Sequence, residues 1–234
     1  MDDVRAVAVE RLELRYAPRA WRFSDARRAD IDAYFATIKR AQPALWNGRV
    51  MLLYDWALLD GRFTGAYFDT DFASMLAWRD WGFPDASVHN CFAQGALRSA
   101  DGAFLLGVMG THTANPGKIY FPSGTPDLDD VVGEAVDLDG SVLRELEEET
   151  GLEASDVEPA PGWHAVFAGP RIGMMKVLQS AEPATALRDR IVAFLARQAT
   201  PELADIRIVR SPADYDPMMP PFITTFLGQI WKGG

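Results

Sequence analysis

Along most of the chain, the order of apolar and polar side chains predicts either a strand or a helix. Residues 4–16 alternate between apolar and polar side chains, as a strand with one buried face does. Residues 24–40 repeat apolar side chains at helical spacing and begin at Ser24 or Asp25, either of which suits an N-cap. The first part of the chain is therefore expected to form a strand followed by a helix.

Two Asp-Gly pairs predict β-hairpins, at Asp60-Gly61 and at Asp101-Gly102. An Asp-Gly pair tolerates the left-handed backbone that tight hairpin turns require, so its place between two apolar runs indicates a turn. The flanking runs are residues 50–59 and 63–68 for the first pair, and residues 88–97 and 103–109 for the second. Both pairs of runs are expected to form antiparallel strands.

The remaining periodic segments mix short strands with helices. Helices are expected at residues 72–81, 141–150, 186–198 and 221–231, and strands at residues 118–121, 163–168, 174–179 and 206–209. Hairpins mixed with helices place the chain in the α/β or α+β class, with a mixed sheet. Residues 122–140 are rich in Asp, Gly and Pro and are expected to form a long loop that is functional or inserted.

A boundary near Phe83-Pro84-Asp85 divides these elements into two parts. Residues 1–85 are interpreted as an N-terminal lobe or extension with a strand, a helix and a hairpin. Residues 86–234 carry the other elements and are interpreted as the main domain. The 234-residue length allows one large domain, or one domain with such an extension.

Composition narrows the class of partner and the compartment. The formal net charge of -10 argues against nucleic acids and anionic membranes as partners, but a bound metal ion would still allow a small phosphorylated ligand. Cys91 is the only cysteine, which excludes a disulfide within the chain and a cysteine-rich zinc site. Because the sequence shows neither a signal peptide nor a membrane-spanning apolar run, a soluble cytoplasmic protein is expected.

An acidic stretch on a predicted helix is the strongest candidate for chemistry. Glu145, Glu148 and Glu149 stand at positions i, i+3 and i+4, so their side chains lie on one helical face. Acidic runs on helices are usually solvated surfaces, and like charges at this spacing repel one another. Hard cations such as Mg²⁺ prefer carboxylate oxygens, so a metal ion would offset that repulsion.

The nine residues from Arg144 to Leu152 resemble the second half of the Nudix box, with every specified position filled. The preceding residues 120–124 resemble the strand and Pro-Gly turn that lead into that box. The resemblance implies a Nudix-like α/β/α sandwich, with residues 86–234 as the catalytic domain. It implies Mg²⁺ or Mn²⁺ as cofactor, with Glu145, Glu148 and Glu149 as metal ligands and Arg144 bracing them.

The first half of the box departs from the family pattern. The family has a glutamate eight residues before the arginine, where this chain has Val136, and Asp130 occupies the position of the expected glycine. An insertion between Gly124 and the helix accounts for both differences. Three acidic residues near the helix are then candidates for the missing carboxylate, namely Glu134, Asp137 and Asp139.

The resemblance implies a metal-dependent hydrolase that cleaves a diphosphate linkage in a nucleoside diphosphate joined to another moiety. The general base is expected to be one of the box glutamates or a later carboxylate, Glu182 or Glu202. Lys118 and Arg171 are candidates for binding the phosphates, although each is equally an ordinary surface charge. The three histidines lack metal-ligand spacing and are assigned no role. Enzymes of this kind are often dimers, so a homodimer is compatible with the resemblance.

A fainter similarity concerns substrate. Residues 45–48 and 67–72 are similar to the N-terminal part of Nudix enzymes that act on UDP-sugars, so a nucleotide sugar is one candidate. Three alternatives to a hydrolase are left open. The least favoured is an isomerase with a Nudix-like fold, because the sequence shows no matching cysteine and glutamate pair for that chemistry. The degenerate first half of the box favours a catalytically silent ligand-binding or sensor module, and the bland alternative is a scaffold protein with an acidic surface helix.

Overall fold

Two mixed β-sheets and six α-helices make up the residues that the computed structural model describes, which are 4–43 and 45–232. The large sheet has the strand order β1-β12-β13-β5-β6-β14, with β11, β7 and β8 pairing at its margins. Its strands are β1 (Arg5–Val9), β5 (Asn90–Arg98), β6 (Phe104–Met109), β7 (Ile119–Tyr120), β8 (Ser123–Gly124), β11 (Val157–Pro159), β12 (Trp163–Ala168), β13 (Arg171–Ser180) and β14 (Leu203–Val209). The small sheet has the order β3-β4-β2-β10-β9, and its strands are β2 (Arg11–Tyr16), β3 (Arg49–Leu59), β4 (Arg62–Asp71), β9 (Val131–Val132) and β10 (Ala135–Val136).

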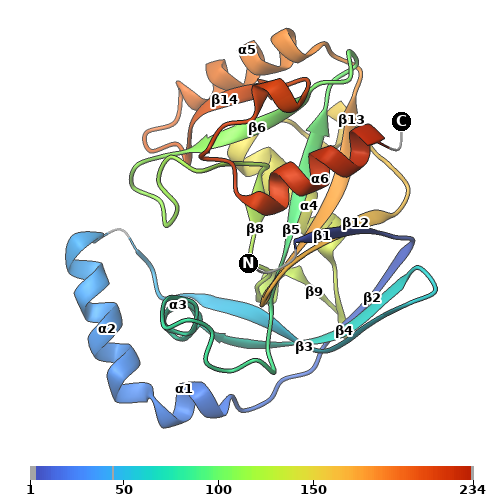
Figure 1. The fold of residues 1–234 in the computed structure, drawn as a ribbon. Coiled ribbons are helices and arrows are strands. Elements are labelled where there is room, and N and C mark those ends of the chain that lie inside the picture. Colours follow the sequence, from blue (N-terminus) through green and yellow to red (C-terminus); the bar gives the residue numbers. More distant parts are fainter. Residues whose placement is uncertain (1–3, 44, 233–234) are drawn as a thin grey trace.

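The large sheet lies between helices, as the expected fold class requires (Figure 1). The helices on this part of the chain are α4 (Leu138–Thr150), α5 (Ala184–Leu195) and α6 (Pro221–Lys232). Neighbouring residues of β5 point to opposite faces. A Cβ on Gly95 would touch Val142 of α4, whereas Phe92 packs on Phe222 of α6. The mixed α/β architecture is confirmed, and none of the described helices has the length and apolarity to cross a membrane.

The small sheet carries three helices on its outer side, namely α1 (Arg22–Ala26), α2 (Arg28–Ala41) and α3 (Phe72–Asp80). Met75 and Trp78 of α3 pack against Leu52 and Phe68 on that face of the sheet. The opposite face joins the main core, where the Tyr67 hydroxyl donates to the carbonyl of Cys91 at 3.1 Å. A single hydrophobic core therefore contains side chains from both sheets.

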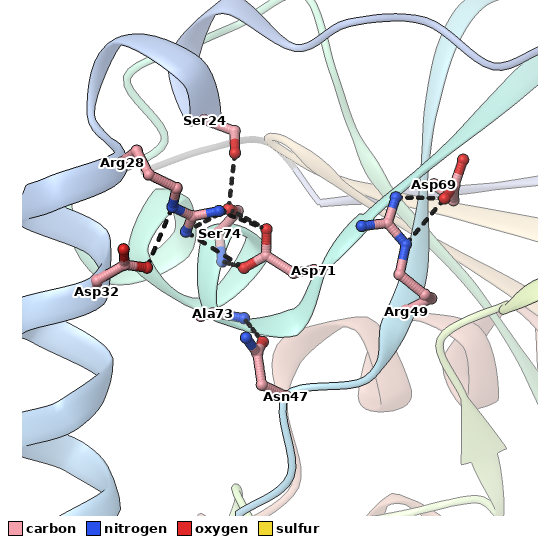
Figure 2. A network of polar contacts seen from close by, with 9 residues as sticks. All are labelled: Ser24, Arg28, Asp32, Asn47, Arg49, Asp69, Asp71, Ala73 and Ser74. Atoms are coloured by element: carbon pink, nitrogen blue, oxygen red, sulfur yellow. Dashed lines mark hydrogen bonds and ion pairs between the residues drawn. The ribbon is translucent and has the colours of Figure 1, made fainter.

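Polar contacts fix the start of α3 (Figure 2). The Asp71 carboxylate caps this helix by accepting from the backbone N–H of Ser74 at 3.0 Å. Arg28 of α2 pairs with the same carboxylate at 2.8 Å, so the two helices share one anchor.

The predicted hairpins are confirmed, but two predicted elements are divided. Asp60 and Gly61 both have left-handed φ angles, 48° and 72°, as the turn chemistry requires. The predicted strand over residues 4–16 bends at Glu10, where the Gly61 carbonyl accepts from two successive N–H groups, and its halves enter different sheets. The predicted helix over residues 24–40 is interrupted at Arg27.

Two segments cross the boundary expected near residue 85. β1 pairs with β12 in the large sheet, and the β9–β10 hairpin pairs with β2 in the small sheet through Ala135 and Arg15. Each part of the chain thus completes the sheet of the other. The two parts also share one hydrophobic core. The division into residues 1–85 and 86–234 stays a prediction.

Candidate active site

Helix α4 carries the acidic residues, and its ends follow from local sequence. Asp137 caps the first turn by accepting from the N–H of Gly140 at 3.0 Å, so the helix begins three residues before the predicted start. Gly151 adopts φ 69° and ends the helix. Val142 and Leu146 are buried against the core, which directs the glutamates at i, i+3 and i+4 toward the other side.

The structure places two of the three predicted glutamates against the turn at β8. Glu149 is 4% exposed, and its Oε1 accepts from the N–H of Ser123 at 3.0 Å. Its Oε2 is buried without a hydrogen-bond partner among the described residues. Glu145 lies so close to Gly124 that a Cβ at that position would collide with the carboxylate. Glu148 is exposed beside them.

These carboxylates lie in an environment that disfavours negative charge. Burial raises the pKa of Glu145 to about 7, with Arg144 opposing the shift and the charge of Glu148 adding to it. Burial likewise raises the pKa of Glu149 well above its usual range, against the Ser123 N–H, and the charge of Glu202 adds to the rise. Such a set of groups is stabilised by a cation.

Among the described residues, Arg144 is the cation that pairs with the acidic cluster, and its closest partner is a residue that the sequence analysis did not identify as such. Its guanidinium lies 2.6 Å from Oδ1 of Asp130, which is 4% exposed, and 3.7 Å from Glu145. Asp130 Oδ2 accepts from the N–H of Asp127 at 3.0 Å, so both carboxylate oxygens are used. Arg144 is thereby held beside the glutamates.

Within the described part of the chain, none of the three residues considered for the first carboxylate of the box makes a hydrogen bond or ion pair with the glutamates of α4. Asp137 caps α4, Asp139 pairs with Lys176 at 3.0 Å, and Glu134 belongs to the β9–β10 hairpin. That hairpin follows Asp130 and lies where the insertion was expected, between Gly124 and the helix. The six-residue spacing from Gly124 to Asp130 equals the glycine-to-glutamate spacing of the family pattern, and this signal would have identified Asp130.

Of the two later carboxylates proposed as base, only Glu202 lies near the cluster. Its charge is among the causes that raise the pKa of Glu145 and of Glu149, after burial. Its own pKa is raised mainly by burial, while His112 opposes the shift. The backbone carbonyl of Glu202 accepts from the N–H of Gly110 at 2.7 Å, and this hydrogen bond fixes the backbone at this residue. Glu182 instead pairs with Arg190 at 2.8 Å.

Lys118 and Arg171 are exposed, and neither forms an ion pair with a described residue. Lys118 directly precedes β7, two residues before Tyr120, whose pKa is raised by burial and further by the charges of Glu149 and Glu202. Arg171 begins β13, in register with Asn90 of β5. Lys118 thus lies near the acidic cluster along the chain, while no contact joins Arg171 to it.

The donor set suits a hard divalent cation in part. Over residues 4–43 and 45–232, no group of three or more His, Cys, Asp or Glu side chains converges to hold one ion by itself. Mg²⁺, however, is commonly bound through one or two carboxylates and completes its shell with water and substrate phosphate. The unpaired Oε2 of Glu149 and the carboxylate of Glu145 are oxygen donors of that kind.

Comparisons with known proteins give structural likeness only. No family model matches the chain, and no curated protein matches it in sequence. Among solved structures, the Nudix hydrolase RenU from M. smegmatis is similar at 18% identity and a TM-score of 0.42, over 62% of this chain and 85% of that one. The MutT protein from Methanosarcina mazei Go1 is similar at 17% identity and a TM-score of 0.42, over 62% and 94% of the two chains. An Ap4A hydrolase from C. elegans is similar at 16% identity and a TM-score of 0.40, over 60% and 98%. Identities this low concern the fold alone.

Proposed function

We propose that this protein is a divalent-metal-dependent hydrolase that cleaves a diphosphate linkage in a small nucleotide-like molecule. One observation carries the proposal: Glu149 is buried and Glu145 largely buried at the β8 turn, and no cation among the described residues fully offsets their charges. Burying carboxylates without compensation costs stability. A site that retains this arrangement is explained by a ligand that brings positive charge.

In the proposed reaction, Glu145, Glu148 and Glu149 would hold Mg²⁺ or Mn²⁺. A bound ion would neutralise charge on the diphosphate and make water a better nucleophile. The chain orients the donors: Gly124 leaves space for Glu145, and the Ser123 N–H fixes one oxygen of Glu149. Arg144, held by Asp130, keeps its positive charge beside Glu145.

Glu202 is the proposed general base. It projects from the segment before β14, so it approaches the cluster from a different element than α4. A base that is separate from the metal ligands can accept the proton of the attacking water while the ligands stay in place. Glu182 is not proposed, because its carboxylate is engaged by Arg190.

The substrate is proposed to be a nucleoside diphosphate joined to another group, and a nucleotide sugar is one candidate. The residues that are similar to UDP-sugar enzymes lie in the N-terminal lobe, where several have structural tasks. Asn47 accepts from the N–H of Ala73 at 2.7 Å, and Asp71 caps α3. Lys118 is proposed to contact phosphate, since it is exposed next to β7; Arg171 remains a weaker candidate.

The test is phosphate release from a panel of organic diphosphates, nucleotide sugars included, with Mg²⁺, with Mn²⁺ and with EDTA. Wild type should turn over at least one compound only with metal, and Glu148→Gln and Glu149→Gln should each lower kcat by at least about 100-fold. Glu147→Gln is the matched control, because this neighbour on α4 is exposed and removed from the cluster. It should keep near-normal activity.

Absence of metal-dependent turnover on every member would contradict the hydrolase. Equal activity in Glu148→Gln and Glu147→Gln would remove the acidic cluster from the reaction. Ligand binding without turnover would favour the silent binding module instead.

A further inference from the structure

A network of polar contacts near the start of β3 contains an ion pair between Arg49 and Asp69 (Figure 2). Asp69 of β4 accepts from the Tyr16 hydroxyl at 2.6 Å through Oδ1, and from Nε of Arg49 at 2.9 Å through Oδ2. Burial would raise the pKa of Asp69, but the hydrogen bonds from Tyr16 and Arg49 outweigh it and the pKa is lowered. Asp69 is therefore a fixed anion that orients Arg49.

The guanidinium of Arg49 retains free donors. Only Nε and Nη2 are bonded to Asp69, and Nη1 donates to none of the described residues. The Arg49 side chain is 50% exposed, whereas Asp69 is mostly buried. A positive group is thus presented to solvent from a rigid partner, in a protein whose net charge is -10.

The course of β3 brings the start of this strand toward the segment that follows the Gly124 turn. Along this strand, Trp56 stacks on Phe167 of β12 at 5.3 Å. Further toward its start, Leu53 bonds to His89, just before β5, at 2.8 and 2.9 Å. Still nearer the start, Met51 N–H donates at 2.7 Å to the carbonyl of Pro126, two residues after Gly124.

Arg49 is the first residue of β3 and lies two residues before Met51. Side chains two residues apart on a strand point the same way, so Arg49 shares a face with Met51 and lies roughly 7 Å nearer the start of the strand. It therefore extends past the segment that leaves the Gly124 turn. In Figure 1 the start of β3 and the long green connection between β6 and β7 lie on the same side of the molecule. That connection carries His112 and ends at Lys118.

The segment that leads into Arg49 is hydrogen-bonded to the start of α3 and carries an exposed aromatic ring. Asn47 accepts from the N–H of Ala73 at 2.7 Å, and the Gly48 carbonyl accepts from Phe72 at 2.8 Å. Trp46, directly before them, is 79% exposed. Exposed tryptophan on a fixed segment offers a stacking surface at little cost in ordering.

We propose that Arg49 and Trp46 form a subsite on the N-terminal lobe that binds the nucleoside diphosphate part of the substrate, with Arg49 on a phosphate and Trp46 against the base. This subsite rests on the proposed function for its place beside the reacting diphosphate. A guanidinium suits phosphate because its N–H groups match the oxygen geometry. Stacking on an indole is tolerant of base identity, so the subsite selects nucleotides as a class.

Calorimetric titration with UDP, ADP and inorganic pyrophosphate in the presence of Mg²⁺ tests this subsite. Arg49→Gln should raise the Kd for UDP or ADP by about tenfold to 100-fold, the usual range for one charged hydrogen-bonding group. Arg49→Lys should restore part of the affinity. Trp46→Ala should raise the Kd of the nucleotides but not that of pyrophosphate. Arg62→Gln is the matched control, since Arg62 is 49% exposed and pairs with Glu13 at the other end of β4; its Kd values should equal those of wild type.

Loss of Arg49 leaves Asp69 without its ion-pair partner, with only the Tyr16 hydroxyl among the described residues bonded to its side chain, so the double variant Arg49→Gln/Asp69→Asn provides a second test without that negative charge. It should retain the wild-type melting temperature within a few degrees and still bind nucleotides weakly. If a turnover assay succeeds, Arg49→Gln should raise KM with little change in kcat, because the contact is remote from the reacting atoms.

The outcomes separate the two proposals. Unchanged nucleotide Kd values in both Arg49 variants, or no binding of UDP or ADP by wild type, overturns the subsite whatever the turnover assay shows. Nucleotide binding that depends on Arg49, without metal-dependent turnover, upholds the subsite and overturns the hydrolase.

Discussion

Glu149 is buried almost completely, and one of its oxygens has no hydrogen-bond partner among the described residues. Its carboxylate therefore destabilises the fold whenever it is ionised without a cation. A contribution to folding does not explain this residue, whereas the proposed metal site does. Natural sites of this kind trade stability for function.

We therefore expect Glu149→Gln to stabilise the protein in EDTA at pH 8. The amide keeps an oxygen for the Ser123 N–H and removes the buried charge, so the free energy of unfolding should rise by about 1–3 kcal/mol. Urea denaturation measures this. Glu147→Gln, on the exposed side of α4, should change it by less than about 0.5 kcal/mol. A Glu149→Gln protein that is less stable than wild type in EDTA would contradict the interpretation.

At the scale of single residues, the spacing of the acidic helix was predictable, and Glu202 was one of two later carboxylates considered as the base, but Asp130 was not identified as the partner of Arg144. Glu145, Glu148 and Glu149 follow from helical geometry alone. Asp130 and Glu202 come from other elements, 14 positions before Arg144 and 58 positions after it in the sequence. The spacing from Gly124 points to Asp130, but the contacts that both residues make with the helix depend on the tertiary fold and are not encoded by a local pattern.

At the scale of elements, the stability of α3 depends on its N-cap residue, Asp71, and on the ion pair between Asp71 and Arg28. Burial opposes the shift, but hydrogen bonds from Arg28 and Ser74 lower the pKa of Asp71 below its usual value. A carboxyl group with a lowered folded-state pKa contributes stability above its unfolded pKa, and this contribution is lost as pH falls through the folded pKa.

Acid should therefore weaken α3 more in wild type than in Asp71→Asn, which keeps an N-cap but loses the charge. Between about pH 5 and pH 2, the wild-type advantage should disappear. Its size is at most about 1 kcal/mol, because Arg28 is half exposed to screening by water. Hydrogen exchange at the Ser74 amide, measured against pH in both proteins, reports it. If the exchange rate depends on pH in the same way in wild type and in Asp71→Asn, then ionisation of Asp71 does not stabilise this helix.

Periodic segments were predicted well because each encodes its own burial pattern. The hairpins at Asp60-Gly61 and Asp101-Gly102 and the helices α3 to α6 lie close to their expected ranges. The segment 122–140 was expected to be a loop, yet it contains β8, β9 and β10. Two-residue strands carry too few positions for a period to be detected, and their pairing with β5 and β2 is what makes them strands.

At the scale of the whole molecule, the parts do not stand alone. β1 supplies the partner of β12, and Met51, Leu53 and Tyr67 fill the core beneath the large sheet. A fragment of residues 86–234 would expose this apolar surface and the free edge of β12.

We expect that fragment to be aggregated or partly folded, with loss of a cooperative thermal transition, while the full chain unfolds cooperatively. Scanning calorimetry and size-exclusion chromatography measure this. Adding a separately made fragment of residues 1–85 should restore part of the transition. A monomeric 86–234 fragment with a sharp transition would establish residue 85 as a true domain boundary.

Strand exchange between the two sheets could not be predicted from the sequence. The alternation over residues 4–16 is continuous and gives no sign that Val9 pairs with Trp163 while Arg11 pairs with Arg62. Periodicity indicates which face of a strand is buried, but it does not indicate which other strand it pairs with.

That exchange also sets an order of events during synthesis. The first strand leaves the ribosome long before residues 163–167, its partners in the large sheet, have been made. The small sheet likewise lacks β9 and β10 until residues 131–136 emerge. Neither sheet can be completed from the amino end onward, so most of the chain must be present before either closes. Pairings this distant raise the contact order and slow folding, and the early strands remain open to wrong partners in the interval.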